Sequence, residues 1–322
     1  MRFDSVLCLI EEAFKSFSEW SNTPGALSAA TLRAPMVSFG IGCGDNTNDS
    51  YKLAVRARTT FGLDLPPVQD IIQKSKNESD VRVVGLMRGP RRIVNFKIDT
   101  AQEMKQRVRP LQSGHSVGHH AITAGTLGTF VKGKQGVMML SNNHVLANSN
   151  QAKIGDAILQ PGNYDGGKNP ADVCGKLVAF KEMKKEHNLM DVAVASIEKN
   201  AMPKDFALPH IGKVGKKVIS PEDILGKQVQ KIGRTTGHTK GKVSAIKLRN
   251  VAVNYRTAIY SFDDLIEVSD PSGGDFSAGG DSGSFVVDMD RNPVGLLFAG
   301  GNGHTLLCEI APILKEFHIE LL

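Results

Sequence analysis

From about residue 109 to the C-terminus, short apolar or alternating stretches are separated by turns rich in glycine, asparagine and aspartate. The clearest stretches are ITAGTLGTFVK, GVMMLSNNHVLA, DVAVASI, GKVSAIKL, GSFVVD and NPVGLLFAGG. Several short strands at this spacing are typical of an all-β barrel or sandwich. The stretch over residues 311–322 predicts a turn and a helix that cap the β region.

The first 108 residues have a different pattern. Apolar residues recur at helical spacing over residues 4–20, which predicts an amphipathic helix. Such a helix could dock on a membrane or a partner, but packing on its own domain is the commoner use of an apolar stripe. Further patterns predict strands over 51–59, 81–87 and 92–98 and a helix over 66–76. We therefore expect an N-terminal α/β accessory domain over 1–108 and a β domain over 109–322.

Composition narrows the class of protein. A chain of 322 residues, 41% hydrophobic and 22% charged, is that of an ordinary soluble globular protein with one large or two smaller domains. The net charge of +6 is spread evenly along the chain, so the sequence gives no indication of nucleic-acid binding.

Four scattered cysteines match no zinc or redox motif, which favours free thiols in a reducing compartment. Acidic residues interrupt the N-terminal apolar run, so it does not resemble a secretion signal, although export without such a signal stays possible. No apolar run approaches the roughly 18–20 residues of a membrane span. We expect a cytoplasmic protein.

The sequence GGDSGSFVVD, residues 279–288, holds the candidate nucleophile, Ser282. A serine hydroxyl is a weak nucleophile at neutral pH and needs a base beside it and donors for the oxyanion that it creates. Because Gly280 lacks a Cβ, its backbone can turn an N–H toward the developing charge, beside the N–H of Ser282.

A base and an acid stand upstream in suitable settings. His144, in SNNHVLA, follows a predicted strand and a polar turn, and Asp191, in MDVAVASI, begins an alternating strand. An acid that orients such a histidine must be mostly buried. The competing acids are Asp156, Asp165 and Asp172, of which the first two lie in turns and Asp172 is the strongest alternative.

The order His144, Asp191, Ser282, with 47 and 91 residues between successive members, is the order of the chymotrypsin-like triad. Together with KIGRTTGHTKGKV and PVGLLFAGG, these motifs resemble the trypsin/chymotrypsin superfamily of serine peptidases, and more narrowly an intracellular-type bacterial branch. The resemblance covers about residues 109–322. It implies two antiparallel six-stranded β-barrels with the triad in the cleft between them.

The resemblance also implies a role for each site residue. Ser282 attacks the scissile carbonyl, His144 takes and returns its proton, and Asp191 orients His144. The N–H groups of Gly280 and Ser282 form the oxyanion hole. The substrate-binding residues implied are Phe276, Ser277, Ala278 and Gly279, and the strand Phe298, Ala299 and Gly300, along which the substrate backbone pairs. Phe276 stands where a trypsin-type enzyme has an aspartate, so no preference for Lys or Arg follows.

The function expected from these motifs is a serine endopeptidase that cleaves a protein or peptide substrate through an acyl-enzyme, without cofactor or metal. The alternative is a catalytically silent protease-fold module that binds peptides or regulates a partner. An esterase with the same triad is a third interpretation, which the absence of a G-x-S-x-G elbow disfavours. The N-terminal domain, by its position, is a candidate for restraint or for binding a regulatory partner.

Asp281 raises a question about activation. In secreted members of the superfamily, the equivalent acid pairs with a newly cleaved N-terminus. Here about 110 residues precede the β domain, and HSVGHH (115–120) lies where such a terminus would begin. Either cleavage near Val117 activates the protein, or Asp281 finds another partner in the intact chain. The second hypothesis is favoured. A metal site at His115, His119 and His120 has no other ligand at suitable spacing and is not expected.

Overall fold

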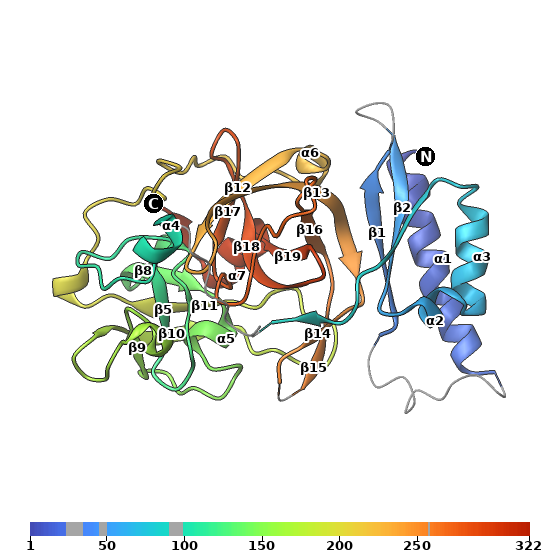
Figure 1. The fold of residues 1–322 in the computed structure, drawn as a ribbon. Coiled ribbons are helices and arrows are strands. Elements are labelled where there is room, and N and C mark those ends of the chain that lie inside the picture. Colours follow the sequence, from blue (N-terminus) through green and yellow to red (C-terminus); the bar gives the residue numbers. More distant parts are fainter. Residues whose placement is uncertain (24–34, 45–49, 90–98, 257) are drawn as a thin grey trace.

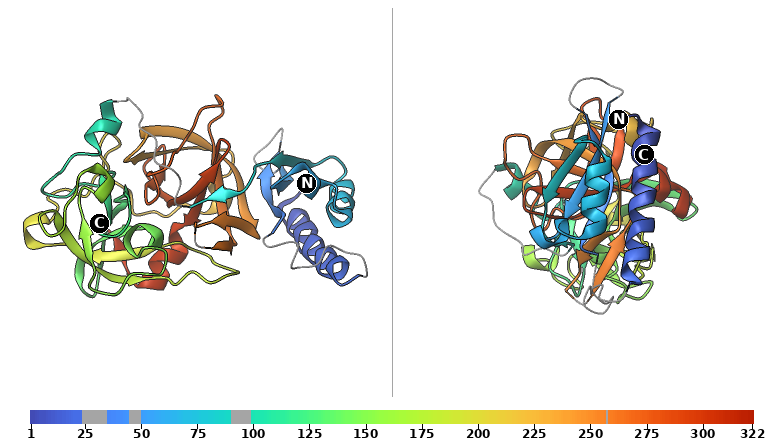
Figure 2. Two further views of the ribbon diagram at one scale, coloured as in Figure 1. Left: turned by 60° about the horizontal axis from the view of Figure 1, so that its bottom comes forward. Right: turned by 90° about the vertical axis from the view of Figure 1, so that its right-hand side faces the viewer.

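The computed structural model describes residues 1–322 except 24–34, 45–49, 90–98 and 257. Most of its regular elements are strands, arranged in two sheets (Figure 1). Figures 1 and 2 show three bodies in a row, with the N-terminal unit at one end and the first β-sheet at the other. The mainly β class predicted from the sequence is confirmed.

The second half of the chain closes into a barrel of six antiparallel strands. The ring runs β12, β13, β16, β19, β18, β17 and returns to β12. The bounds are β12 (Gln228–Gly233), β13 (Gly237–Arg249), β16 (Leu265–Ser269), β17 (Phe285–Asp288), β18 (Pro293–Gly301) and β19 (His304–Glu309). A hairpin, β14 (Val251–Asn254) and β15 (Ile259–Phe262), lies between β13 and β16 in the chain, and the short helix α6 (Pro221–Ile224) precedes β12.

The first sheet has eight strands in the order β20-β7-β8-β11-β10-β9-β5-β6 and forms a half-barrel. The bounds are β5 (Ser116–His119), β6 (Gly125–Thr126), β7 (Thr129–Gly133), β8 (Gly136–Ser141), β9 (Ala157–Leu159), β10 (Val173–Phe180), β11 (Ala193–Ser196) and β20 (Glu320–Leu321). The helical elements on this side are α5 (Asn143–Leu146), η1 (Asn163–Asp165) and η2 (Lys199–Ala201).

The first sheet has eight strands where six were expected, and one of the two additional strands comes from the chain end, which returns to the sheet. After helix α7 (Ile310–Phe317), strand β20 pairs with β7. The helix predicted over 311–322 is therefore α7 followed by a strand. The double β-barrel arrangement predicted from the motifs is confirmed, with a closed second barrel and an open first one.

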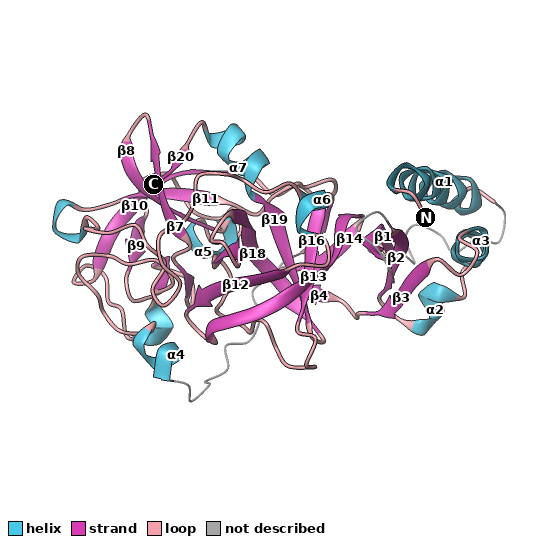
Figure 3. Cartoon of the chain, turned by 90° about the horizontal axis from the view of Figure 1, so that it is seen from above, coloured by secondary structure: helices cyan, strands magenta, loops and turns pink. Residues whose placement is uncertain are grey.

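The N-terminal unit is a three-stranded sheet with helices on one face (Figure 3). Its elements are α1 (Phe3–Ser21), β1 (Val37–Cys43), β2 (Tyr51–Ala57), α2 (Thr60–Leu63), α3 (Pro66–Lys74) and β3 (Ser79–Val83). Helix α1 buries Val6, Ile10 and Ala13, as its apolar spacing predicted, and α3 begins at a proline, which suits a first helical turn. The strand expected over 92–98 lies outside the described residues.

The N-terminal sheet continues directly into the second barrel. Strand β1 pairs antiparallel with the second half of β13, where Phe39 opposes Arg249 and Ile41 opposes Ile246. One hydrophobic cluster extends from Val6 on α1 through Phe39 to Leu307 in the barrel. The expected domain boundary at 108 stays a prediction. Residues that precede it, β4 (Met87–Arg88) and α4 (Asp99–Glu103), lie against the second barrel.

Within the described residues, no helix combines the length and the apolar character needed to cross a bilayer. All four cysteines carry free thiols, with Cys8 and Cys43 exposed and Cys174 and Cys308 buried. Burial raises the pKa of the Cys174 thiol to about 12.

Candidate active site

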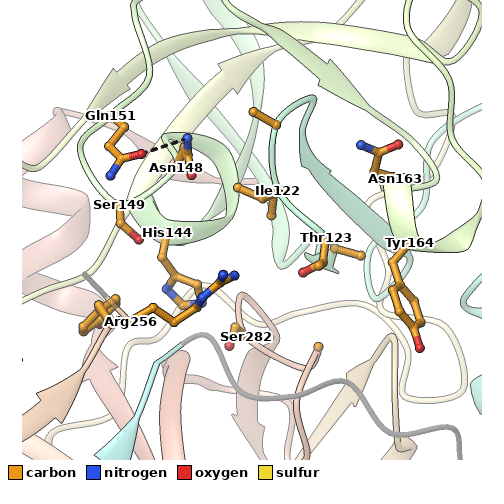
Figure 4. Close-up of a pocket in the computed structure, with 14 residues that line it drawn as sticks. Ile122, Thr123, His144, Asn148, Ser149, Gln151, Asn163, Tyr164, Arg256 and Ser282 are labelled. Atoms are coloured by element: carbon orange, nitrogen blue, oxygen red, sulfur yellow. Dashed lines mark hydrogen bonds between the residues drawn. The ribbon is translucent and has the colours of Figure 1, made fainter. Parts of the chain in front are cut away.

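The candidate nucleophile and base line the same cleft (Figure 4). The cleft has a volume of about 740 Å³ and receives Ser282 and Gly280 from one barrel and His144 from the other. His144 lies on α5, directly after β8, so a rigid strand fixes the start of its helix. In Figure 4 the imidazole of His144 stands above Ser282, with Arg256 beside it.

His144 contacts the predicted acid. Its Nδ1 lies 2.5 Å from Oδ2 of Asp191, and its backbone N–H donates to Oδ1 at 3.2 Å. Asp191 is fully buried. The backbone around it is held as well, since the side chain of Asn142 donates to its carbonyl at 2.8 Å. A buried carboxylate at this nitrogen fixes the tautomer with a free Nε2 facing the cleft.

A third donor to Asp191 was missed by the sequence reasoning. The hydroxyl of Tyr255, at the end of β14, donates to Oδ2 at 2.7 Å. Burial, and then the neighbouring charge of Asp191, raise the pKa of Tyr255 well above its usual value, so the hydroxyl stays protonated and can donate. Its ring also packs edge-on against His144, with centroids 5.6 Å apart. Nothing in the local sequence marks this tyrosine.

The three competing acids each have a partner elsewhere. Asp156 lies 3.1 Å from Nε2 of His119, Asp165 pairs with Arg234, and Asp172 accepts from Nε of Arg107 at 2.8 Å. Of the four aspartates considered, Asp191 is the one in contact with His144.

The hydroxyl of Ser282 donates to the carbonyl oxygen of Phe298 at 3.4 Å. Nε2 of His144 is buried and has no hydrogen-bond partner among the residues that the structure describes. A buried polar atom without a hydrogen-bond partner lowers the stability of the fold, and the few such atoms in native proteins often belong to functional sites. The free Nε2 and the rotatable hydroxyl of Ser282 lie in one cleft, so a turn of the hydroxyl is the movement that a proton transfer would require.

Two threonine hydroxyls hold the backbone of the loop before Ser282. The carbonyl of Gly279 accepts from the hydroxyl of Thr235 at 2.7 Å. In a trans peptide the C=O and the following N–H point in opposite directions, so the N–H of Gly280 turns away from Thr235. Gly280 has φ +103°, in the region that glycine adopts without strain. Its own carbonyl accepts from Thr126 at 2.9 Å, which ties the loop to the first sheet.

Asp281 finds its partners inside the intact chain. Its Oδ1 accepts from the backbone N–H of Thr235 at 2.8 Å, and its Oδ2 accepts from the Thr236 hydroxyl at 2.8 Å and from the N–H of Ala278 at 2.9 Å. Nζ of Lys231 lies 3.6 Å from Oδ2 and is fully buried. Burial lowers the pKa of Lys231, while the charge of Asp281 opposes that shift.

These contacts support the second of the two activation hypotheses. A carboxylate with a buried ammonium and several N–H and O–H donors needs no new N-terminus. Val117, the terminus that cleavage would release, is fully buried in β5, paired with β6.

The predicted substrate-binding residues are all buried. Phe276 packs into the second barrel, with its ring 5.9 Å from Nζ of Lys231. The hydroxyl of Ser277 lies 2.7 Å from that of Thr305. The other positions with little or no exposure are Ala278, Gly279, Phe298, Ala299 and Gly300. Their part in substrate binding stays a prediction.

The histidines of HSVGHH are used structurally. Nδ1 of His115 lies 3.3 Å from the carbonyl oxygen of Ser113, and the rings of His119 and His120 are tilted against each other with their centroids 4.2 Å apart. Burial lowers the pKa values of His115 and His119, which favours their neutral forms. The described residues hold no group of three or more His, Cys, Asp or Glu arranged as metal ligands.

The strand pairing of the closed barrel and the placement of His144 and Ser282 on either side of the cleft identify the architecture. The chain has a chymotrypsin-like fold. A model of the Nal1 C-terminal domain matches residues 207–310, about a third of the chain, and its description names no activity. No curated protein matches the chain.

Solved structures of similar fold are serine proteases with low sequence identity. One, described as a glutamic acid specific serine protease, is 14% identical and has a TM-score of 0.48 over 66% of this chain and 100% of its own. Thermobifida fusca protease A is 15% identical, with a TM-score of 0.46 over 66% and 97%. An α-lytic protease homologue, N4, is 19% identical, with a TM-score of 0.46 over 66% and 99%. Values this low carry no information about activity.

Proposed function

We propose that the protein is a serine endopeptidase that hydrolyses peptide bonds through Ser282, His144 and Asp191. The supporting observation is the contact of Nδ1 of His144 with buried Asp191 at 2.5 Å, which leaves Nε2 free in the cleft that holds Ser282. In this proposal Ser282 attacks the substrate carbonyl carbon and its proton passes to Nε2 of His144. The resulting imidazolium is stabilised by Asp191.

The rest of the cycle uses the backbone and the same histidine. The N–H groups of Gly280 and Ser282 donate to the oxyanion of the tetrahedral intermediate, and His144 protonates the leaving amine as the acyl-enzyme forms. Water then attacks the acyl-enzyme by the reverse sequence and releases the acid. No cofactor is required for any of these steps.

The experiment is the reaction of the purified protein with a fluorophosphonate probe, read by intact mass. We expect one probe adduct on the wild type and none on Ser282→Ala. Ser149→Ala is the matched control, because Ser149 lines the same cleft beside His144 and should leave the adduct in place (Figure 4). Equal labelling of wild type and Ser282→Ala would refute the proposal.

The alternative, a silent peptide-binding module, is favoured by one observation: the hydroxyl of Ser282 donates to the carbonyl of Phe298 and not to His144. The same probe separates the two functions, since a silent module stays unlabelled. A cytoplasmic location also stays a proposal, supported by the four free thiols. Fractionation of cells with an antibody to the protein tests it.

A further inference from the structure

The edge of β18 that is expected to pair with substrate is already paired with another part of the chain. Strand β4 lies antiparallel to β18, with Arg88 opposite Gly300. On its other side β4 lies parallel to β14, with Met87 opposite Val253 and Arg88 opposite Asn254. The segment therefore occupies a slot between β18 of the second barrel and β14 of the hairpin that follows β13.

Several contacts hold residues 84–89 in this slot. The side chain of Asn302, in the turn after β18, donates to the carbonyl of Val84 at 3.2 Å. The N–H of Gly89 donates to the carbonyl of Asn254 at 3.2 Å. The side chain of Met87 is 2% exposed and packs in the main hydrophobic cluster, whereas Arg88 points to solvent. Two buried side chains, those of Val84 and Met87, and a few backbone bonds thus anchor the segment.

The segment also contacts the residue that supports Asp191. Gly89 lies so close to the ring of Tyr255 that an added Cβ would stand 2.6 Å from it. The hydroxyl of the same tyrosine donates to Asp191. A glycine is needed at this position because the backbone passes directly over the ring.

We propose that residues 84–89 are an internal inhibitory strand that occupies the substrate-pairing edge, and that an extended peptide binds after displacing it. The inference rests on the proposed function, which assigns that edge to substrate. An extended peptide bound by addition to a sheet edge gains backbone hydrogen bonds from that edge, and one edge accepts one strand at a time. The antiparallel direction of β4 on β18 is one that an added strand can take.

The segment is short enough to be displaced. Its ladder has two residues, and elements with few buried contacts open at low free-energy cost. The preceding strand, β3, stays attached to β2 by five paired positions, so the segment can leave without unfolding the N-terminal sheet. The apparent affinity for peptide is then the intrinsic affinity multiplied by the fraction of molecules in which the edge is free.

A reversible covalent lock tests the proposal. The pair Arg88→Cys and Asn254→Cys joins directly opposed residues of β4 and β14, whose Cα separation in a sheet suits a disulfide. The exposed native thiols are removed by Cys8→Ser and Cys43→Ser. Binding of fluorescein-labelled casein, an extended protein chain, is measured by anisotropy in a Ser282→Ala background, before and after reduction.

We expect oxidation to weaken casein binding by about tenfold or more and reduction to restore it. Equal affinity of the two forms would overturn the proposal, and so would the absence of binding by the reduced form, because the freed edge should accept an extended chain. The binding assay does not depend on catalysis. Failure of fluorophosphonate labelling in the protein with Ser282 would therefore refute the proposed function, while the casein-binding assay would still decide whether residues 84–89 inhibit peptide binding.

A second variant covers the case in which the disulfide does not form. Met87→Ser removes one of the two buried anchors, the one within β4, and should tighten casein binding by about threefold or more, because the fraction of molecules with a free edge rises. Val83→Ser, on the neighbouring strand β3 and 46% exposed, is the control and should leave binding unchanged. Weaker or unchanged binding by Met87→Ser, with native circular dichroism, would contradict the inhibitory role.

Discussion

Tyr255→Phe removes a hydrogen bond from the candidate triad. The hydroxyl is buried and donates to Oδ2 of Asp191 at 2.7 Å. Phenylalanine keeps the ring and its packing against His144, so the change leaves no cavity larger than a single oxygen atom. A hydrogen bond to a charged group contributes about 1.5–3 kcal/mol.

The effect on catalysis follows from what remains. Asp191 keeps two donors, both from His144, so the carboxylate stays bound to the histidine. It loses the hydrogen bond from Tyr255, which also restrains its orientation. If that hydrogen bond stabilises the transition state by about 1.5 kcal/mol more than the ground state, its loss lowers kcat about tenfold. KM should change by less than about twofold, because the hydroxyl that is removed is bound to Asp191 and only the buried ring of Tyr255 borders the cleft.

The assay is peptide hydrolysis by the wild type and Tyr255→Phe, with urea unfolding of both proteins as a measure of stability. Tyr260→Phe is the matched control, since its ring lies 5.4 Å from that of Tyr255 and no hydrogen bond joins it to Asp191 in the structure. A kcat within twofold of the wild type for Tyr255→Phe would refute the argument that Tyr255 positions the acid. A loss of kcat in Tyr260→Phe of similar size would show that the effect is general to the cluster.

Three further predictions follow from buried groups. Gly280→Ala should reduce the rate of fluorophosphonate labelling about 100-fold or more. A residue with a Cβ is strained at φ +103°, and the Cβ would collide with the hydroxyl of Thr235. The collision would move the N–H of residue 280, one of the two proposed oxyanion donors. Lys231→Met should lower the free energy of unfolding by about 3 kcal/mol, since it leaves Asp281 without its buried cation. The double variant with Asp281→Asn should recover part of that loss in urea titrations. Burial alone would raise the pKa of Glu267, but the Arg56 guanidinium lowers it well below its usual range. The carboxylate therefore stabilises the fold above about pH 4.5, and that contribution is lost progressively as the pH falls from there toward the lowered pKa. Glu267→Gln should flatten the dependence of urea midpoints between pH 6 and pH 3, and an unchanged slope would contradict this.

Sequence patterns were informative where a local rule governs the outcome. The apolar spacing of the first helix, the proline at the start of α3 and the short strands after residue 109 all reflect local periodicity, and the elements appear as predicted. The contact of His144 with Asp191 was also anticipated, because motif order implied it. Their roles in a reaction stay predictions until the probe experiment is done.

What the sequence did not reveal depends on contacts between distant residues. Tyr255 and Asp191 are 64 positions apart, and Lys231 and Asp281 are 50 apart, so no local pattern links them. One of the two additional strands of the first sheet was missed for the same reason, since β20 joins the sheet from the other end of the chain. The single strand predicted over residues 81–87 instead splits, because its first part pairs with β2 and its end lies between β14 and β18.

The N-terminal unit cannot be assigned a role by simple deletion. Strand β1 pairs with β13, and the cluster around Phe39 extends into the second barrel, so removal of residues 1–108 would expose a sheet edge and a large apolar surface. Loss of activity after such a deletion would therefore report unfolding as readily as regulation. The segment 84–89 is the better point of intervention, because it touches both the β18 edge and Tyr255 while carrying only two buried hydrophobic side chains, Val84 and Met87. If a peptide displaces this strand, the ring of Tyr255 loses its contact with Gly89 at the same time as the β18 edge becomes free. Substrate binding and the support of Asp191 would then be coupled through one tyrosine, and the loss of kcat in Tyr255→Phe should persist when Met87→Ser has already loosened the strand.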